Sequence, residues 1–174
     1  MMDIRKEDLC LRKVTKSDIP QIMEIELELF ADPWSPEIFQ EELENSNIFT
    51  KEINGISFNC KHNYLLEYQE QVLGFVLGWA ICDEYSIMNI GVRKKYQKQG
   101  LGSFLLSKVI EKAIELECFT IYLDVRKSNF PAIKLYEKFK FEKIGLRKHY
   151  YQNPFEDAVV MKLDLETTDK MMDS

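Results

Sequence analysis

The chain has 174 residues, of which 45% are hydrophobic and 30% are charged, and its formal net charge at pH 7 is -6. A chain of this size and composition can bury a substantial core, so we expect one globular domain over residues 1–165 and a flexible tail at 166–174. The acidic balance excludes a general nucleic-acid binder, which needs a broad basic face to displace counterions.

The N-terminal stretch MMDIRKEDLC lacks the apolar core of a signal peptide, and the longest apolar run, residues 72–81, is too short to span a bilayer. We therefore expect a cytoplasmic protein with no membrane partner. The four cysteines are far apart and form no CxxC pair, and the only histidines are His62 and His149. This pattern favours buried free thiols over a metal site.

Residues 9–15 (LCLRKVT) alternate apolar and polar side chains, as in a half-buried strand. A helix is expected next, with Thr15 or Ser17 as its cap and Pro20 in its first turn. Pro33, in the turn ADPWS, blocks its continuation. A second helix is expected in the run SPEIFQEELE that follows.

Residues 45–63 mix Asn, Gly, Ser and isolated aromatic residues without a clear period, which indicates a variable loop. Strand patterns return at residues 64–68 (YLLEY), 72–81 (VLGFVLGWAI) and 86–92 (SIMNIGV). Their short polar connections predict three adjacent strands in an antiparallel meander.

The basic stretch RKKYQKQGLGS, residues 93–103, lies between the third of these strands and the apolar period of a helix. A helix N-terminus binds anions through its unpaired N–H groups and the positive end of its dipole. Gly100 and Gly102 let the backbone approach a phosphate closely. Four cationic side chains attract the same anion: Arg93, Lys94, Lys95 and Lys98. The pattern indicates a pyrophosphate cradle, and a solvated basic turn is the simpler alternative because short glycine motifs recur by chance.

The spacing of Gln97, Gly100 and Gly102 is neither that of a P-loop, GxxxxGK[ST], nor that of the dinucleotide fingerprint GxGxxG. Four further elements are predicted downstream: a strand at 120–126 (TIYLDVR), a short helix at 132–139 (AIKLYEKF), a strand from Phe141 and a last strand around 158–165 (AVVMKLDL).

With these elements in order, residues 9–165 resemble the GNAT superfamily of acetyl-CoA-dependent N-acetyltransferases, most specifically in VRKKYQKQGLGSFLLSKVI and LDVRKSNFPAIKLYEKFKF. Within the superfamily the chain is most similar to the RimI group, which acetylates the N-terminal alanine of a small-subunit ribosomal protein. Four segments carry this likeness: PWS at 33–35, NIGV at 89–92, DVRKSN with LYEKFKF, and YYQNPFEDAVVM at 150–161. The sequence departs from that group at Asp124, where Glu is usual, and at Lys140, where Gly is usual.

The resemblance implies an α+β fold with three layers (α/β/α). It consists of a mixed, mostly antiparallel sheet of about seven strands, splayed in the middle and flanked by about four helices. It implies that acetyl-CoA lays its pyrophosphate on the N–H groups of residues 97–103 and its pantetheine arm along residues 89–92. A backbone N–H near residues 90–92 would stabilise the oxyanion. The implied acetyl-CoA contacts are Ile90, Gly91, Val92, Gln97, Lys98, Gln99, Gly100, Leu101, Gly102, Ser103 and Asn129. No metal is implied.

The resemblance also implies catalytic roles. Tyr136 is the expected general acid for the leaving thiolate, and Asp124 is the expected base, acting through a bridging water because its side chain is short. Glu84 is a second candidate base. From the residues alone, Tyr136 is equally typical of a core aromatic side chain, Asn129 of a helix cap and Glu84 of a surface carboxylate.

Acceptor contacts are expected from Trp34, in the FADPWS turn, and from Tyr150 and Tyr151, in the predicted connection HYYQNPFED between the last two strands. These aromatic residues are equally suited to pinning loops onto the core. Three functions remain open: an acetyltransferase for a protein N-terminus, such as that of a ribosomal protein; a GNAT enzyme for a small amine; and a non-catalytic CoA-binding module. The sequence leaves the oligomeric state open.

Overall fold

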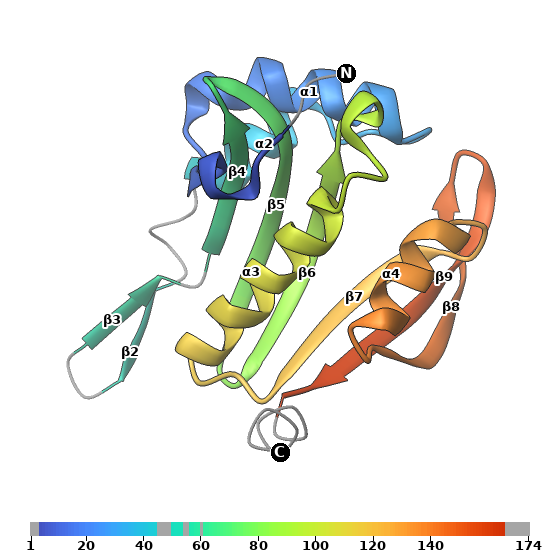
Figure 1. Ribbon diagram of the computed structural model, residues 1–174. Coiled ribbons are helices and arrows are strands. Elements are labelled where there is room, and N and C mark those ends of the chain that lie inside the picture. Colours follow the sequence, from blue (N-terminus) through green and yellow to red (C-terminus); the bar gives the residue numbers. More distant parts are fainter. Residues whose placement is uncertain (1–3, 45–49, 54–55, 60, 166–174) are drawn as a thin grey trace. The chain divides into compact units, whose positions relative to one another are not determined.

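The computed structural model describes residues 4–44, 50–53, 56–59 and 61–165 (Figure 1). The chain divides into two compact units. Unit 1 comprises Met1–Gly78 and Asn89–Leu105, and unit 2 comprises Trp79–Met88 and Leu106–Ser174. The single domain over residues 1–165 stays a prediction, and the predicted tail at 166–174 lies outside the described residues.

Among the described residues, seven strands form one sheet in the order β1-β4-β5-β6-β7-β9-β8. This mixed sheet confirms the predicted architecture, and β4, β5 and β6 are neighbours as the meander requires. The strands are β1 (Cys10–Lys13), β4 (Lys61–Tyr68), β5 (Gln71–Ile81), β6 (Glu84–Val92), β7 (Thr120–Arg126), β8 (Glu142–Gln152) and β9 (Phe155–Asp164).

The four expected helices are present in the described part of the chain: α1 (Ile19–Leu29), α2 (Pro36–Glu44), α3 (Leu101–Glu115) and α4 (Phe130–Lys138). A 3-10 turn, Lys16–Asp18, leads into α1, and the Thr15 N–H donates to Asp18 Oδ2 at 2.7 Å. Pro20 lies in the first turn of α1, as predicted. No helix within the described ranges is long and apolar enough to cross a membrane.

The core of unit 1 lies between α1 and the strands. Ile22 and Ile25 of α1 are fully buried in one cluster with Leu65 of β4 and Phe75 of β5. Two glycines let β5 and β6 pack closely, because a Cβ built at Gly74 would lie 2.5 Å from the Gly91 carbonyl oxygen. These contacts fix the end of β6 against β5 and α1.

Unit 2 includes the parallel pairing of β6 with β7 and the antiparallel pairings of β7 with β9 and of β8 with β9. β6 pairs with β7 in parallel over four residues, from Glu84↔Thr120 to Ile87↔Leu123. β7 pairs with β9 along its whole length, as far as Arg126↔Ala158. β8 pairs with β9 with two register shifts, and nearly all of its side chains are exposed.

Three predictions need correction. Residues 45–63 are not one variable loop, because β2 (Thr50–Ile53) and β3 (Ile56–Asn59) form a two-stranded antiparallel sheet and β4 begins at Lys61. The connection HYYQNPFED is mostly strand, because β8 extends to Gln152 and β9 begins at Phe155. Cys118 is a buried free thiol as predicted, whereas Cys10 and Cys82 are exposed.

Candidate functional site

The turn before α3 has the backbone geometry of an anion site. The first helical hydrogen bond of α3 runs from the Phe104 N–H to the Gly100 carbonyl oxygen at 2.9 Å, so the N–H groups of residues 101–103 have no acceptor within the helix. Gly100 has φ 84°, in the left-handed region that favours glycine. The side chain of Gln97 donates to the Val92 carbonyl oxygen at 2.9 Å, which holds the turn to the end of β6.

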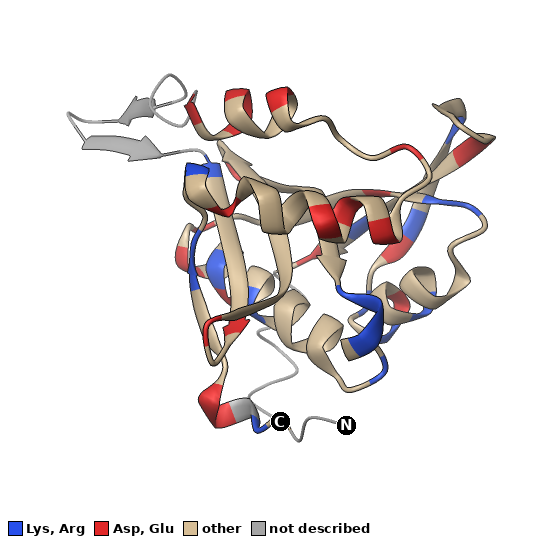
Figure 2. Ribbon diagram, turned by 90° about the horizontal axis from the view of Figure 1, so that it is seen from above, with Lys and Arg blue, Asp and Glu red and all other residues tan. Residues whose placement is uncertain are grey.

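The cations of this turn differ in what they can do. Figure 2 shows the run of basic residues, in blue, on the turn that leads into α3. Contrary to the prediction, Arg93 is not available to a ligand. Its Nε donates to the Val72 carbonyl oxygen at 3.0 Å, and its NH2 group donates to Glu24 at 2.6 Å. Lys94 and Lys98 are exposed. The attraction for an anion therefore depends on the lysines, and Arg93 holds the turn in place.

Helix α1 holds the end of β6 and the turn through three carboxylates. Glu24 binds the guanidinium of Arg93, and Glu28 accepts the Lys94 N–H at 2.9 Å. Glu26 accepts from the side-chain amide of Asn89 at 2.6 Å. The stretch from Asn89 to Lys94 is thus fixed to one helix at three points.

Glu26 also reaches the turn after α1. Its Oε2 accepts the Trp34 N–H at 3.0 Å, and the residue is only 1% exposed. Burial raises the pKa of Glu26, and the two hydrogen bonds from Trp34 and Asn89 oppose that rise. The Trp34 ring packs against Phe39 of α2, with a centroid distance of 5.5 Å. Trp34 is therefore held to the core of unit 1 by both its backbone and its ring.

In unit 2, Asp124 lies on β7 opposite Val160 of β9. Its side chain is 23% exposed, and both of its oxygens lie 3.2 Å from the Nε of Arg147 on β8. An acceptor amine that approached Asp124 would share its carboxylate with this guanidinium.

Tyr136 lies on α4 and is 6% exposed, with its ring 5.8 Å from that of Phe141. Burial, with a smaller contribution from Tyr151, raises the pKa of the Tyr136 phenol, which therefore keeps its proton at neutral pH. Tyr151 interacts electrostatically with Tyr136 and with Asp124, and burial raises its pKa to about 12. The structure thus gathers the predicted acid, the predicted base and one predicted acceptor contact within unit 2.

Tyr150 and Tyr151 lie on β8 beside one of its register shifts, and the strand between them and Arg147 includes His149 with φ 53°. Their rings meet edge to face, with a centroid distance of 5.1 Å. The guanidinium of Arg126 lies over the Tyr151 ring at 4.0 Å. Tyr150 remains 49% exposed, as a contact for an external ligand requires.

Asn129 caps α4, because its side-chain oxygen accepts the Ala132 N–H at 3.3 Å. The structural alternative for this residue is therefore confirmed, and its contact with acetyl-CoA stays a prediction. Beside it, Glu156 of β9 accepts from the backbone N–H and the hydroxyl of Ser128. Glu84, the second candidate base, is exposed at the start of β6.

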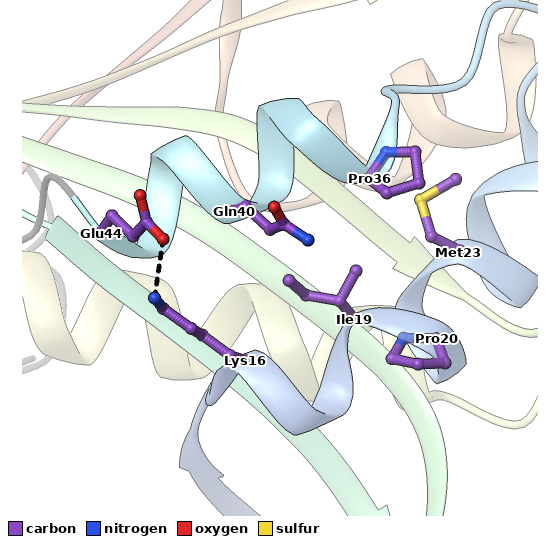
Figure 3. Close-up of a pocket in the computed structure, with 7 residues that line it drawn as sticks. All are labelled: Lys16, Ile19, Pro20, Met23, Pro36, Gln40 and Glu44. Carbon is purple, nitrogen blue, oxygen red and sulfur yellow. Dashed lines mark hydrogen bonds and ion pairs between the residues drawn. The ribbon is translucent and has the colours of Figure 1, made fainter.

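A separate pocket of about 500 Å³ lies between α1 and α2 in unit 1 (Figure 3). The ion pair between Lys16 and Glu44, at 2.7 Å, lies at one end of it. The residues that line the pocket are Lys16, Ile19, Pro20, Met23, Pro36, Gln40 and Glu44. None of them is a predicted contact for acetyl-CoA or for the acceptor.

Sequence reasoning missed Glu26, Arg147 and any role for the side chain of Asn89, whose backbone was included in the predicted pantetheine strand. For Glu26 a signal was present, because it follows Ile22 and Ile25 on the apolar stripe of α1, where a carboxylate is unexpected.

Comparison with known proteins agrees with these observations. Residues 19–141 match the acetyltransferase (GNAT) family. A putative [ribosomal protein bS18]-alanine N-acetyltransferase of Bacillus subtilis is 32% identical over 156 residues, which cover 90% of this chain and 95% of the relative. The N-alpha-acetyltransferase RimI of Mycobacterium tuberculosis is 30% identical over 166 residues, covering 91% of this chain and 94% of the relative.

Among solved structures, the ribosomal-protein-S18-alanine N-acetyltransferase from Escherichia coli superposes with a TM-score of 0.76 at 29% sequence identity. The match covers 90% of this chain and 94% of the other.

Proposed function

The chain belongs to the acetyltransferase (GNAT) family, and from this premise we propose that it acetylates the N-terminal α-amine of a protein, with the N-terminal alanine of ribosomal protein bS18 as its acceptor. Its activity is that of an acetyl-CoA-dependent N-acetyltransferase. The observation that carries the choice of acceptor is the similarity, over about nine-tenths of the chain, to bS18-alanine N-acetyltransferases.

Acetyl-CoA supplies an activated acetyl thioester and a pyrophosphate by which it can be held. The turn before α3 fits that pyrophosphate, because it combines free N–H groups, a left-handed Gly100 and nearby lysines. The backbone of residues 90–92 binds the pantetheine arm as an added strand, with one N–H directed at the thioester oxygen. The residues assigned to acetyl-CoA are Ile90, Gly91, Val92, Gln97, Lys98, Gln99, Gly100, Leu101, Gly102, Ser103 and Asn129.

The acceptor nitrogen attacks the thioester carbon directly, and the carbon–sulfur bond breaks. Asp124 receives the proton of the amine through a bridging water, and Tyr136 gives its proton to the sulfur of the leaving thiolate. The phenol of Tyr136 is protonated at neutral pH, as a general acid must be at the start of each turnover, and burial, by raising its pKa, makes release of that proton depend on close approach of the thiolate.

An N-terminal acceptor places a small demand on the base. Removing a proton from an α-amine with a pKa near 8 costs about 1 kcal/mol at neutral pH, whereas a lysine costs roughly 4 to 5 kcal/mol. Asp124 shares its carboxylate with Arg147, and this suits an acceptor that is already partly deprotonated. Trp34, Tyr150 and Tyr151 are the assigned contacts of the acceptor peptide.

The direct test uses the full-length bS18 protein with a free N-terminal alanine as acceptor. Incubation with acetyl-CoA and the enzyme should add one acetyl group, which tandem mass spectrometry locates on the α-nitrogen. A bS18 variant with proline in place of the N-terminal alanine is the matched control and should stay unmodified. Acetylation of lysine side chains in both proteins would overturn the proposal, as would reaction with spermidine alone.

A further inference from the structure

Glu26 is a buried carboxylate without a cationic partner in the described part of the chain. Its two oxygens accept from two uncharged donors, the Trp34 N–H at 3.0 Å and the Asn89 side-chain amide at 2.6 Å. It is 1% exposed, on the face of α1 that buries Ile22 and Ile25. Burying a charge in this way opposes folding, since two neutral donors replace its water only in part.

The unfavourable burial points to a functional role. A glutamine or an apolar residue at position 26 would avoid the burial of a charge, and burial accordingly raises the pKa of Glu26. Costly buried carboxylates are found where a protein needs the chemistry of the charged group. The question is what the carboxylate does that an amide cannot do.

A carboxylate fixes the orientation of the Asn89 amide. An ionised carboxylate only accepts hydrogen bonds, so Asn89 must turn its NH2 group toward Glu26. The Asn89 carbonyl oxygen, Oδ1, then points away from Glu26. Asn89 is half-buried, so part of this residue is open to solvent.

The Asn89 side chain lies on the face of β6 that packs on α1. Successive side chains of a strand alternate between faces, so Asn89 and Gly91 share one face. That face packs on α1, because a Cβ built at Gly91 would lie 2.8 Å from Leu29 and 3.5 Å from Ile25. The turn that carries Trp34 is tied to the same helix. Asn89 therefore directly precedes residues 90–92, which are assigned to the thioester, on the same strand, and Glu26 links it to the turn that carries Trp34, an assigned acceptor contact.

We propose that Asn89 Oδ1 accepts a hydrogen bond from the α-amine of the acceptor, and that Glu26 is a positioning residue that holds the Asn89 amide in this orientation. The inference rests on the proposed function, and it names a group that orients the acceptor nitrogen. An amine that donates one N–H to Asn89 has its lone pair directed elsewhere, toward the thioester carbon. Glu26 also accepts the Trp34 N–H, so it fixes the turn that carries Trp34 and the Asn89 amide relative to each other.

The variant Glu26→Gln separates orientation from packing. Glutamine has nearly the same volume as glutamate and keeps one oxygen for the Trp34 N–H. Its NH2 group then faces Asn89, which must rotate its amide by half a turn and present Oδ1 to residue 26. The acceptor amine would meet an NH2 donor in place of an oxygen.

The experiment measures kcat/KM for a peptide with N-terminal alanine in the wild type, Glu26→Gln, Asn89→Ala and the double variant. Each single variant should lose roughly 10-fold to 100-fold, the contribution of one hydrogen bond to a charged or polarised group. The double variant should lose no more than either single variant, because both substitutions remove the same interaction. Acetyl-CoA affinity, measured by calorimetry, should be unchanged in all three.

The double variant also protects the test against misfolding. Asn89→Ala alone leaves the buried carboxylate of Glu26 short of one donor, whereas the double variant removes the charge as well. Glu41→Gln is the matched control, since it removes one exposed carboxylate from α2 and should retain full activity.

Three results would overturn this inference while leaving the proposed function intact: wild-type kcat/KM in Glu26→Gln, losses that multiply in the double variant, or a parallel loss of acetyl-CoA affinity. A wild-type protein that binds acetyl-CoA but acetylates no peptide would instead overturn the proposed function, and this inference with it.

Discussion

Replacement of Gly74 by alanine tests the close packing that fixes the end of β6. The added Cβ would lie 2.5 Å from the Gly91 carbonyl oxygen and 3.2 Å from both Leu105 and Val92. The nearest of these atoms belongs to the backbone, so a change of side-chain rotamer cannot relieve the contact. Either β5 or β6 must move. The contact is with Gly91 of β6, and residues 90–92 of this strand are the ones assigned to the pantetheine arm and the thioester.

Overpacking of this kind destabilises a core by about 1–3 kcal/mol. For a chain of this length, that corresponds to a melting temperature lower by roughly 2–12 °C. Gly145→Ala is the matched control, because its Cβ would lie 3.8 Å from Val160, in ordinary contact. Differential scanning calorimetry should show a lower melting temperature for Gly74→Ala only, and titration should show weaker acetyl-CoA binding. Equal melting temperatures for the two variants would refute the packing argument.

Three further predictions concern the acid, the turn and pH. Tyr136→Phe should lower kcat roughly 100-fold or more while Tyr122→Phe, on β7, should not; equal rates in steady-state assays would remove the acid assignment. Gly100→Val should weaken acetyl-CoA binding roughly 10-fold in calorimetry, because a β-branched residue is strained at φ 84°; unchanged affinity would contradict it. Hydrogen bonding to Arg12 lowers the pKa of Asp18 from its ordinary value of 3.8 to about 2. Its stabilisation is thus complete above pH 4 and lost as pH falls toward 2. Urea unfolding should show that the free energy of unfolding falls by about 2 kcal/mol between pH 4 and pH 2. The variant Asp18→Asn has no carboxylate to titrate at this position, so an equal fall in this variant would argue against the role of the Arg12–Asp18 pair.

The sequence predicted the main strands and helices closely, because each shows a clean period between turn residues. It failed at residues 45–63, where the Asn54–Gly55 pair between two short runs is a hairpin signal that outweighs the weak period. It also failed at the end of β8. Tyr150 and Tyr151 lie in β8 beside a register shift between Arg147 and Tyr151, and a shift of this kind depends on pairing with β9, which local sequence does not reveal.

The predicted site divides in the same way. The geometry of the turn at residues 97–103 was predictable, since glycines before a helix favour a backbone with unpaired N–H groups, and its contact with acetyl-CoA stays a prediction. The partners of Arg93 and Asn89 were not predictable, because Glu24 and Glu26 are more than 60 residues away in the chain. Local patterns indicate which groups are present, and tertiary packing decides which of them remain free for a ligand.

The most direct test of the central claim is acetyl transfer from acetyl-CoA to a panel of acceptors, read by mass spectrometry. The panel contains peptides that begin with alanine, serine or methionine, an N-terminally blocked lysine peptide, and spermidine. We expect acetylation of a free α-amine, with the alanine peptide preferred and the blocked lysine peptide unmodified. Transfer to spermidine but to none of the free N-termini would contradict the assignment of a protein N-terminus as the acceptor.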